Sequence, residues 1–319
     1  MKFLKVTASG ESFASSLEET ATPVPGSGEV LVRIAASGIN RADLSQIAGR
    51  YPPPPGESEI LGMEISGTVV ETGERVCALL AGGGDAEYAA VPEGQMFPAP
   101  PGLDLVSAGG IPEAFLTAYL NLVLEGGLER GGRALVHAGA SGVGLAAIQT
   151  ARFLGAAVAA TTRSASKVPA LRSAGAELAI DSREGNFAET IEGAWGKNAI
   201  DIVLDPVGAV TLSGNLRVLA TGGRIVFLAT MSGAKTELDI AAVMVKRARL
   251  VGSTLRSRSR AEKAALVARF RRDVLPGFEG GNLSVAVDSV FPPERAAEAF
   301  ARMKKNENTG KILIDWTGR

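Results

Sequence analysis

The stretch RALVHAGASGVGLAAIQTARFLG, residues 133–155, joins a short apolar run, a glycine-rich turn and a segment with helical spacing. Its apolar side chains recur at helical intervals, at Val143, Ala147, Ile148, Ala151 and Leu154. One face of that segment therefore points inward. A second apolar run at 157–161 follows about one unit further on, so the pattern predicts a strand, a turn, a helix and a parallel strand.

The turn itself, Gly139-Ala140-Ser141-Gly142-Val143-Gly144, is the candidate phosphate-binding loop. Glycines allow positive φ and bring backbone N–H groups close to a pyrophosphate at the positive end of the following helix. Ser141 replaces the second glycine of the strict dinucleotide pattern, so a purely structural turn is the alternative. A nucleophile elbow is excluded, because Val143 stands where that motif needs glycine. His137 is expected to pack in the core.

The end of the second strand bears on the choice of dinucleotide. NAD-binding chains usually place Asp or Glu about 20 residues beyond the turn, to bind the ribose 2′-hydroxyl. Here the sequence reads TTRSASK over residues 161–167, with no acid. Arg163, Ser164 and Lys167 are candidates for binding an adenosine 2′-phosphate, which favours NADPH. The alternative is a solvated loop with two ordinary surface cations.

The composition excludes several classes of function. Lys plus Arg (33) nearly balance Asp plus Glu (34), so the charge expected of a nucleic-acid or membrane-surface binder is absent. With one cysteine and one histidine, the chain has too few ligands for a Cys-rich zinc site or a two-His metal face. The first ten residues have no signal-peptide apolar core, and no window reaches about 18 apolar residues. A cytoplasmic protein with a small-molecule partner is expected.

Two kinds of pattern divide the chain. Up to about residue 111, short β-rich runs at 30–35, 67–71 and 75–80 are broken by prolines and glycines, which predicts a β-barrel-like module. Residues 112–252 alternate apolar runs with helix-length segments, typical of a doubly wound parallel sheet. From 253 onwards we expect a helix at 260–270, an apolar stretch at 283–291, a helix at 294–304 and a final strand at 311–315.

That final strand must join a sheet, and the N-terminal module is one candidate. The nucleotide-binding domain would then be an insertion between residues 1–111 and 253–319.

With these segments in order, the chain resembles the zinc-free quinone oxidoreductases of the medium-chain dehydrogenase/reductase superfamily, and most of all the branch induced by a tumour suppressor. The similarity runs nearly end to end, and it is carried by the segments SGINRAD (37–43), GRYPPPPG (49–56), ILGMEISG (60–67), RVCALL (75–80), PEAFLTAY (112–119), HAGASGVG (137–144), GSTLRSR (252–258) and TGKILI (309–314). It implies a Rossmann domain inserted in a GroES-like β-barrel catalytic domain.

The resemblance also implies a metal-free reaction. Zinc enzymes of this superfamily hold their metal with a Cys and a His at the places occupied here by Asn40 and Met63, which cannot serve in the same way. The structural zinc lobe needs four cysteines, and this chain has one. The resemblance therefore implies hydride transfer from a nicotinamide without a Lewis acid.

The same resemblance implies a set of site residues. Asn40, Tyr51 and Thr117 are expected to border the nicotinamide and the substrate, while Asn308 and Lys311 close the cleft. Asn40 could instead cap a turn, and Tyr51 and Thr117 could instead pack between domains. The backbone from Leu228 to Met231, at the end of a parallel strand, is expected to face the cofactor.

Two departures from the family stand out. The connection at Thr72-Gly-Glu74 is about a dozen residues shorter than in relatives, and it is expected to be a surface hairpin. Ser182 stands where many relatives carry a tyrosine near the adenosine phosphate, and neighbouring Arg183 is a candidate to compensate for it.

The expected activity is NADPH-dependent reduction of a quinone, with Tyr51 as the candidate proton donor if the acceptor is an enone. The alternatives are an enone or 2-enoyl thioester reductase, or a non-catalytic NADPH-binding protein. The basic residues of 246–260 give the only local support for nucleic-acid binding, and a charge run is usually a solvated face. The resemblance implies a homodimer, with residues 241–254 as a candidate contact.

Overall fold

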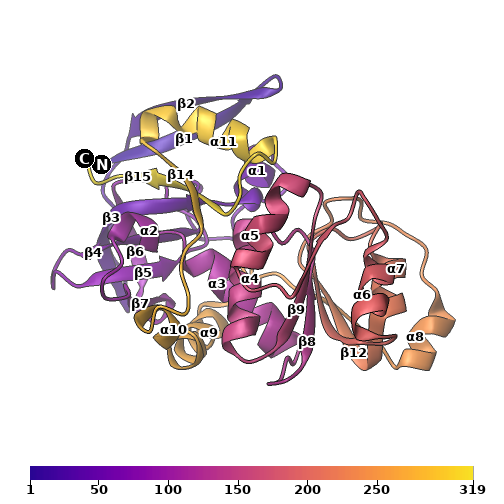
Figure 1. Cartoon of the computed structure of the whole chain (residues 1–319). Coiled ribbons are helices and arrows are strands. Elements are labelled where there is room, and N and C mark those ends of the chain that lie inside the picture. The colour runs from indigo at the N-terminus through magenta and orange to yellow at the C-terminus, as the bar shows by residue number, and fades with distance from the viewer. Residues whose placement is uncertain (319) are drawn as a thin grey trace. The chain divides into compact units, whose positions relative to one another are not determined.

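The structure is a computed structural model that describes residues 1–318. The chain divides into two compact units (Figure 1). Unit 1 joins Met1–Leu116 to the chain from Leu255 onwards, and unit 2 is Thr117–Thr254. The boundaries between the units, at 116/117 and 254/255, lie five and two residues beyond the boundaries predicted from the sequence, at 111/112 and 252/253.

A parallel sheet of six strands forms the centre of unit 2, within residues 117–254, in the order β10-β9-β8-β11-β12-β13. The strands are β8 (Arg133–Val136), β9 (Ala157–Thr162), β10 (Leu178–Asp181), β11 (Ile200–Asp205), β12 (Leu219–Phe227) and β13 (Arg249–Gly252). Counted along the unit, the order is 3-2-1-4-5-6, which is the doubly wound arrangement. The strand order reverses between β8 and β11, and ligands of such sheets bind beside that point.

Helices cover both faces of this sheet. In Figure 1, α4 and α5 lie on one face, while α6 and α7 lie on the other. The helical segments are η2 (Leu120–Glu125), α4 (Gly142–Phe153), η3 (Ala165–Lys167), α5 (Val168–Ser173), α6 (Phe187–Trp195), α7 (Leu212–Val218) and α8 (Ile240–Lys246). Because both faces are covered, the central strands are almost entirely apolar, as with Leu135, Val203 and Ile225.

Unit 1 is built mainly on antiparallel strands. Its strands are β1 (Lys2–Ser9), β2 (Ser12–Glu19), β3 (Glu29–Ile39), β4 (Glu64–Val69), β5 (Arg75–Leu79), β6 (Tyr88–Pro92), β7 (Met96–Pro98), β14 (Val287–Phe291) and β15 (Lys311–Asp315). The main sheet has the order β14-β15-β3-β4-β5-β7, and β6 also pairs with β3. Strand β15 lies antiparallel to β3, with Ile312 opposite Ile39. The final strand therefore joins the N-terminal module, so the nucleotide-binding sheet is an insertion.

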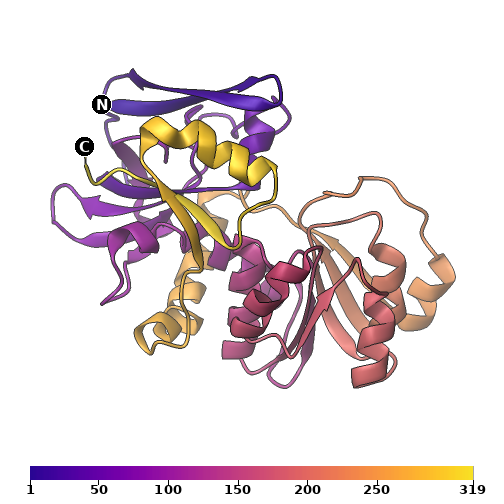
Figure 2. The ribbon, with the colours of Figure 1, turned by 45° about the horizontal axis from the view of Figure 1, so that its top comes forward.

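Unit 1 also contains helical segments, of which α3 runs on into unit 2. They are α1 (Arg41–Ile47), η1 (Glu93–Gln95), α2 (Leu105–Ala108), α3 (Pro112–Tyr119), α9 (Arg260–Asp273), α10 (Pro276–Glu279), η4 (Pro293–Arg295) and α11 (Ala296–Lys304). Figure 2 shows α11 running alongside the β1–β2 hairpin, where the rings of Phe13 and Phe300 have their centroids 5.9 Å apart. Apolar side chains from α11, β3 and β15 make one core.

Two local expectations can be compared with the structure. The short connection at 72–74 is a surface hairpin, with Gly73 at φ +75° and a 2.9 Å hydrogen bond from Val69 N to Glu74 O. The apolar stretch 283–291 is a strand only from Val287. Leu283 N instead donates to Gly277 O in α10 at 2.9 Å, which keeps the start of the stretch out of the sheet.

Candidate functional site

The glycine turn joins β8 to α4. Ser141 is the N-cap residue of α4, and its hydroxyl accepts the Gly144 N–H at 3.0 Å. A Cβ on Gly144 would lie 2.5 Å from Ala138 O and 2.7 Å from the Gly139 backbone, so only glycine allows this close turn. All six residues expected to hold a phosphate, Gly139 to Gly144, lie in this turn or the first turn of α4.

This turn suits the pyrophosphate of a dinucleotide. The first N–H groups of a helix have no intrahelical partner, and the helix dipole adds partial positive charge there. Helix α4 is twelve residues long. Its N-terminus follows β8, where the strand order reverses, so the turn lies where doubly wound sheets bind ligands.

The end of β9 carries the residues expected to select NADPH. Arg163 is exposed, and the Ser164 hydroxyl lies 2.9 Å from that of Ser166. Lys167 ends the short η3 segment. These groups share one loop beyond the carboxyl end of β9, and their side chains are at least partly accessible.

An acid that the sequence pattern did not reveal lies beside this loop. Asp181 ends β10 and pairs with Thr162 at the end of β9. Its Oδ1 accepts the Arg183 N–H at 2.9 Å, whereas its Oδ2 is buried without a hydrogen-bond partner among the described residues. The exposed Arg183 guanidinium lies 3.8 Å from Oδ1. A carboxylate oxygen of this kind can accept a ribose hydroxyl, which bears on the choice between NADPH and NADH.

The backbone from Leu228 to Met231 lies beyond the carboxyl end of β12. Leu228 N donates to Asp205 O at 3.1 Å and Met231 N to Pro206 O at 3.2 Å, which ties this loop to the end of β11. Both residues are at least partly accessible. Because these strands are parallel, the loops after β8, β9, β11 and β12 all lie at the carboxyl ends of the strands, on the same side of the sheet.

His137 is buried between these loops in a network of hydrogen bonds. Its Nδ1 lies 2.8 Å from Thr161 Oγ1, and its Nε2 lies 2.7 Å from Asn215 Oδ1. Asn215 in turn donates to Asp205 Oδ2 at 2.7 Å. Burial lowers the pKa of His137, more than the Asp205 carboxylate raises it. The residue is part of the core, as expected, and it links the ends of β8, β9 and β11 through polar contacts.

Thr117 opens unit 2 with an unpartnered hydroxyl. Its Oγ1 is buried and makes no hydrogen bond within residues 1–318, and the same holds for Oδ1 of Asn121. Asn121 Nδ2 donates to Thr117 O at 2.8 Å, across the start of the π-helical segment η2. Single π turns occur often at functional sites. The Thr117 hydroxyl can therefore form a hydrogen bond to a ligand, as the predicted contact requires. Asn121 is a polar neighbour that the sequence did not reveal.

Asn40 and Lys311 meet in unit 1, although 271 positions separate them. Lys311 Nζ donates to Asn40 Oδ1 at 2.9 Å and to Ile39 O at 3.2 Å, and it forms an ion pair with Glu64. Asn40 Nδ2 donates to Gly38 O and Glu64 Oε1. Lys311 is predicted to contact the cofactor, and its ammonium has three protein partners in the structure, Ile39 O, Asn40 Oδ1 and Glu64.

A pair of buried acids lies beside this cluster. Asp43, in α1, is buried with Asp85, and Oδ1 of Asp43 and Oδ2 of Asp85 have no hydrogen-bond partner among the described residues. Burial and then the charge of Asp85 raise the pKa of Asp43 to about 8. Burial also raises the pKa of Asp85 to about 6. Asp43 Oδ2 accepts the Asn40 N–H at 2.7 Å, so this pair supports the same loop.

Tyr51 and Asn308 complete the expected residues. Tyr51 is half-buried, and burial raises the pKa of its phenol above the usual value. Asn308 is buried, and its Nδ2 donates to Gly310 O at 2.8 Å, which holds the approach to β15. Met63 is buried in the core, and the Cys77 thiol contacts Ala108 O at 3.4 Å. Among residues 1–318, no three His, Cys, Asp or Glu side chains are grouped to share a metal ion.

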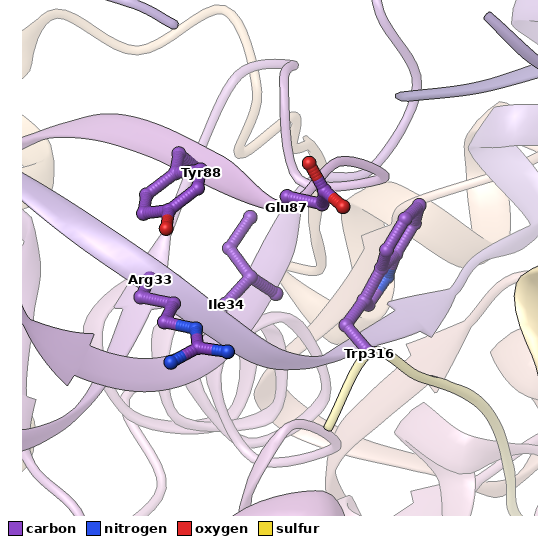
Figure 3. A pocket seen from close by; sticks show the side chains of 5 residues that line it. All are labelled: Arg33, Ile34, Glu87, Tyr88 and Trp316. Atoms are coloured by element: carbon purple, nitrogen blue, oxygen red, sulfur yellow. The ribbon is translucent and has the colours of Figure 1, made fainter. Parts of the chain in front are cut away.

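Two small hollows lie in unit 1 away from these residues. One of them, of about 120 Å³, is lined by the five residues labelled in Figure 3, Arg33, Ile34, Glu87, Tyr88 and Trp316. The other, of about 330 Å³, is lined by the segments 20–29, 56–60 and 80–83, with Arg260 at its wall. Neither contains a residue expected at the active site. The described helices include none with the length and apolarity to cross a membrane.

Comparison with known proteins identifies the family. Residues 26–83 match the alcohol dehydrogenase GroES-like domain and residues 142–270 the zinc-binding dehydrogenase model. The chain is 30% identical to a rat synaptic vesicle membrane protein VAT-1 homolog, over 92% of this chain and 78% of the relative. It is 28% identical to human quinone oxidoreductase, over 93% and 92%.

A solved structure agrees with these matches. The quinone oxidoreductase from Thermus thermophilus, also solved in complex with NADPH, is 32% identical and superposes with a TM-score of 0.83 over 99% of this chain and 100% of that one. The chain belongs to the zinc-free branch of the medium-chain dehydrogenase/reductase superfamily. This medium-chain reductase is therefore an NAD(P)-dependent oxidoreductase with a Rossmann domain and a GroES-like domain.

Proposed function

We propose that this medium-chain reductase transfers hydride from NADPH to a quinone without a metal. The observation that carries the proposal is the glycine turn at the N-terminus of α4, with cationic Arg163 and Lys167 in the loop after β9. A 2′-phosphate is bound well by such cations. The quinone oxidoreductases among its relatives support the choice of acceptor.

When bound, NADPH would supply a hydride. The chain's own residues bind and orient: the 139–144 turn for the pyrophosphate, Arg163, Ser164 and Lys167 for the 2′-phosphate, and Thr117 with residues 228–231 along the nicotinamide side. A quinone needs little acid catalysis, because its ring stabilises the reduced anion. Orientation therefore supplies most of the rate enhancement.

Asn40 would act from a fixed position. Both Nδ2 hydrogens are engaged, by Gly38 O and Glu64, and its Oδ1 accepts from Lys311. Asn40 thus shapes the wall of the substrate site and keeps the buried Lys311 charge close to it. Lys311 and Asn308 fix the start of β15 through their hydrogen bonds to Asn40 Oδ1 and Gly310 O, on the side predicted to close over the cofactor.

Reduction of an enone or 2-enoyl thioester is the second candidate. It is favoured by Tyr51, whose hydroxyl has no hydrogen-bond partner within residues 1–318 and can serve a ligand. The enolate formed by hydride transfer would take its proton from that phenol.

A non-catalytic role in binding nucleic acid has less support. In the basic run, Arg256 is buried, and Lys246 donates to Asn198 Oδ1 and Arg217 O. Arg260 is paired with Glu29 at 2.7 Å. Internal contacts engage these cations, so they do not make one phosphate-binding surface.

The proposal also includes a homodimer and a cytoplasmic location.

The experiment is to follow NADPH and NADH oxidation against an ortho-quinone, a para-quinone, a simple enone and an enoyl thioester, with and without a chelator. Chelator-resistant quinone turnover that prefers NADPH is the expected result. Turnover only with the enone or thioester would replace the proposal with its second candidate. Tight NADPH binding with no turnover would leave the non-catalytic role.

A further inference from the structure

Arg256 is a buried arginine that lies against the loop carrying Tyr51. Its side chain and backbone are only 3% exposed, and it stands at the start of the second part of unit 1. Nε donates to Ala81 O at 2.6 Å, Nη2 to Gln46 Oε1 at 2.7 Å and Nη1 to Tyr51 O at 3.0 Å. One guanidinium thus joins α1, the loop after it and the segment just beyond β5.

The same guanidinium also lies over the Tyr51 ring. The carbon Cζ is 5.3 Å from the ring centroid, within the range of a cation–π contact. Gln46 in turn donates to Glu59 O at 2.9 Å, which closes the loop between α1 and β4. Both the backbone and the ring of Tyr51 are therefore held, whereas its hydroxyl has no partner among the described residues. A held ring with an available hydroxyl is suited to serve an external acceptor.

We propose that Arg256 is the positioning residue for Tyr51, and that it thereby determines whether acceptors that require a proton are reduced. The proposal rests on the second candidate function above, reduction of an enone. In that reaction the β carbon of the enone receives the hydride from NADPH, giving NADP⁺, and the C=C electron pair moves to form an enolate. The Tyr51 hydroxyl gives its proton to the α carbon, and water reprotonates the phenolate.

Two charges of opposite sign act on this phenol. Burial makes the largest contribution to the pKa of Tyr51 and raises it. The Glu113 carboxylate, in the first turn of α3, also raises this pKa, whereas Arg256 lowers it. Asp43 and Glu59 are further carboxylates that face Arg256. Removing Arg256 must therefore raise the pKa of the Tyr51 phenol, and removing the Glu113 charge must lower it. A loss of packing alone would not produce these opposite shifts.

The first test titrates the phenol directly and needs no turnover. The chain has three tyrosines, so ring-¹³C-tyrosine NMR, with Tyr51→Phe to assign the signal, follows Tyr51 alone. The expected result is a higher pKa in Arg256→Met and a lower one in Glu113→Gln. Arg260→Met, which removes an exposed arginine from α9, is the matched control and is expected to leave the pKa unchanged. Shifts in the same direction, or none, would overturn the proposal.

The second test separates proton-requiring acceptors from quinones. Arg256→Met is expected to lower kcat for the enone at least tenfold, and to leave quinone turnover and the Kd for NADPH close to wild type. Arg256→Lys keeps the charge but lacks the planar group, so its Tyr51 pKa is expected near wild type while enone turnover stays low. Equal losses for both acceptors would assign Arg256 a structural role and overturn the proposal.

Failure of the proposed function gives a different result. A wild-type protein that reduces neither acceptor would refute the function, and the NMR titration would still decide whether Arg256 and Glu113 act on Tyr51 in opposite directions. If Arg256→Met does not fold, Gln46→Ala removes one of the three anchors of the guanidinium. It is expected to reduce enone turnover selectively, and an equal loss for quinone would count against the proposal.

Discussion

The ammonium of Lys311 donates a 2.9 Å hydrogen bond to Oδ1 of Asn40, and both residues are buried. The same ammonium is paired with Glu64, which is also buried. Removing one partner of a buried pair leaves an uncompensated charge, at a cost of about 3–5 kcal/mol. Lys311→Met is therefore expected to lower the free energy of unfolding by about that amount, measured by urea denaturation.

The control for this prediction removes both charges. Lys311→Met with Glu64→Gln is expected to be more stable than Lys311→Met alone, because no unpaired carboxylate stays in the core. Lys305→Met, at an exposed position, is the matched surface change and is expected to have little effect. A double variant as unstable as the single one would mean that packing of the lysine stem, and not its charge, stabilises this loop.

Asp43 and Asp85 predict how stability depends on pH. Their folded pKa values, about 8 and about 6, lie above the unfolded value of about 3.9. The folded state therefore binds more protons between these values, and stability falls as pH rises from about 4 to about 8. Each such proton contributes a slope of at most about 1.4 kcal/mol per pH unit.

Asp85→Asn tests this pH dependence. It removes the charge that faces Asp43, so the loss of stability between pH 5 and pH 9 is expected to be smaller than in the wild type. Urea denaturation across that range measures it. Parallel pH curves for the two proteins would mean that the buried pair does not titrate there.

The loop after β9 predicts cofactor preference. Arg163→Ala with Lys167→Ala is expected to raise the KM for NADPH roughly tenfold or more and to leave the KM for NADH nearly unchanged, because a charged hydrogen bond contributes about 1.5–3 kcal/mol. Asp181→Asn tests the opposite preference, since its unpartnered oxygen is suited to a ribose hydroxyl. A loss of NADH turnover alone in that variant would assign Asp181 to the ribose. Equal effects on both cofactors would remove these residues from the selection of NADPH.

The glycine turn could be predicted because its signal is local. Strand, turn and helix follow one another within residues 133–155, and the spacing of apolar side chains is enough to order them. The link between Lys311 and Asn40 could not be predicted in this way. It depends on the antiparallel register of β15 on β3, two strands far apart in the sequence.

Two other residues were missed for related reasons. Asp181 could not be predicted from the residues that follow β9, because it lies in β10 and only the pairing of the two strands brings it beside Thr162. Arg256 was read as one charge of a basic run. Its burial depends on three acceptors, Ala81 O, Tyr51 O and Gln46, that come from a distant part of the chain. Local patterns predict elements and loops, whereas partners across the fold need the tertiary structure.

The edge of the parallel sheet predicts the contact in the proposed homodimer. Strand β13 ends the sheet, and the adjacent α8 exposes Met244 (71%) and Val245 (79%). Exposed apolar groups beside a sheet edge are suited to pair with a second copy. Met244→Glu with Val245→Lys is expected to shift the protein from dimer to monomer in light scattering, while Val24→Glu, at another exposed apolar position, is expected to leave the mass unchanged. A monomeric wild type would contradict the proposal.

His137 gives the most direct check of the network behind the glycine turn, because it is the only histidine in the chain. Asn215 Nδ2 donates to Asp205, so its Oδ1 faces the imidazole and accepts a hydrogen bond from Nε2–H. Nδ1 must then accept from the Thr161 hydroxyl. Nitrogen NMR of the labelled ring is expected to show the neutral Nε2–H form at pH 7, in line with a lowered pKa.

Two variants test what that tautomer does. Thr161→Val leaves Nδ1 without its donor and is expected to lower the free energy of unfolding by about 1–3 kcal/mol. Asn215→Asp places a second carboxylate against Nε2 and is expected to raise the pKa of His137, because an opposite charge favours the protonated ring. An Nδ1–H signal in the wild type, or an unchanged pKa in Asn215→Asp, would mean that the ring is held by packing against Phe187 and not by this chain of hydrogen bonds.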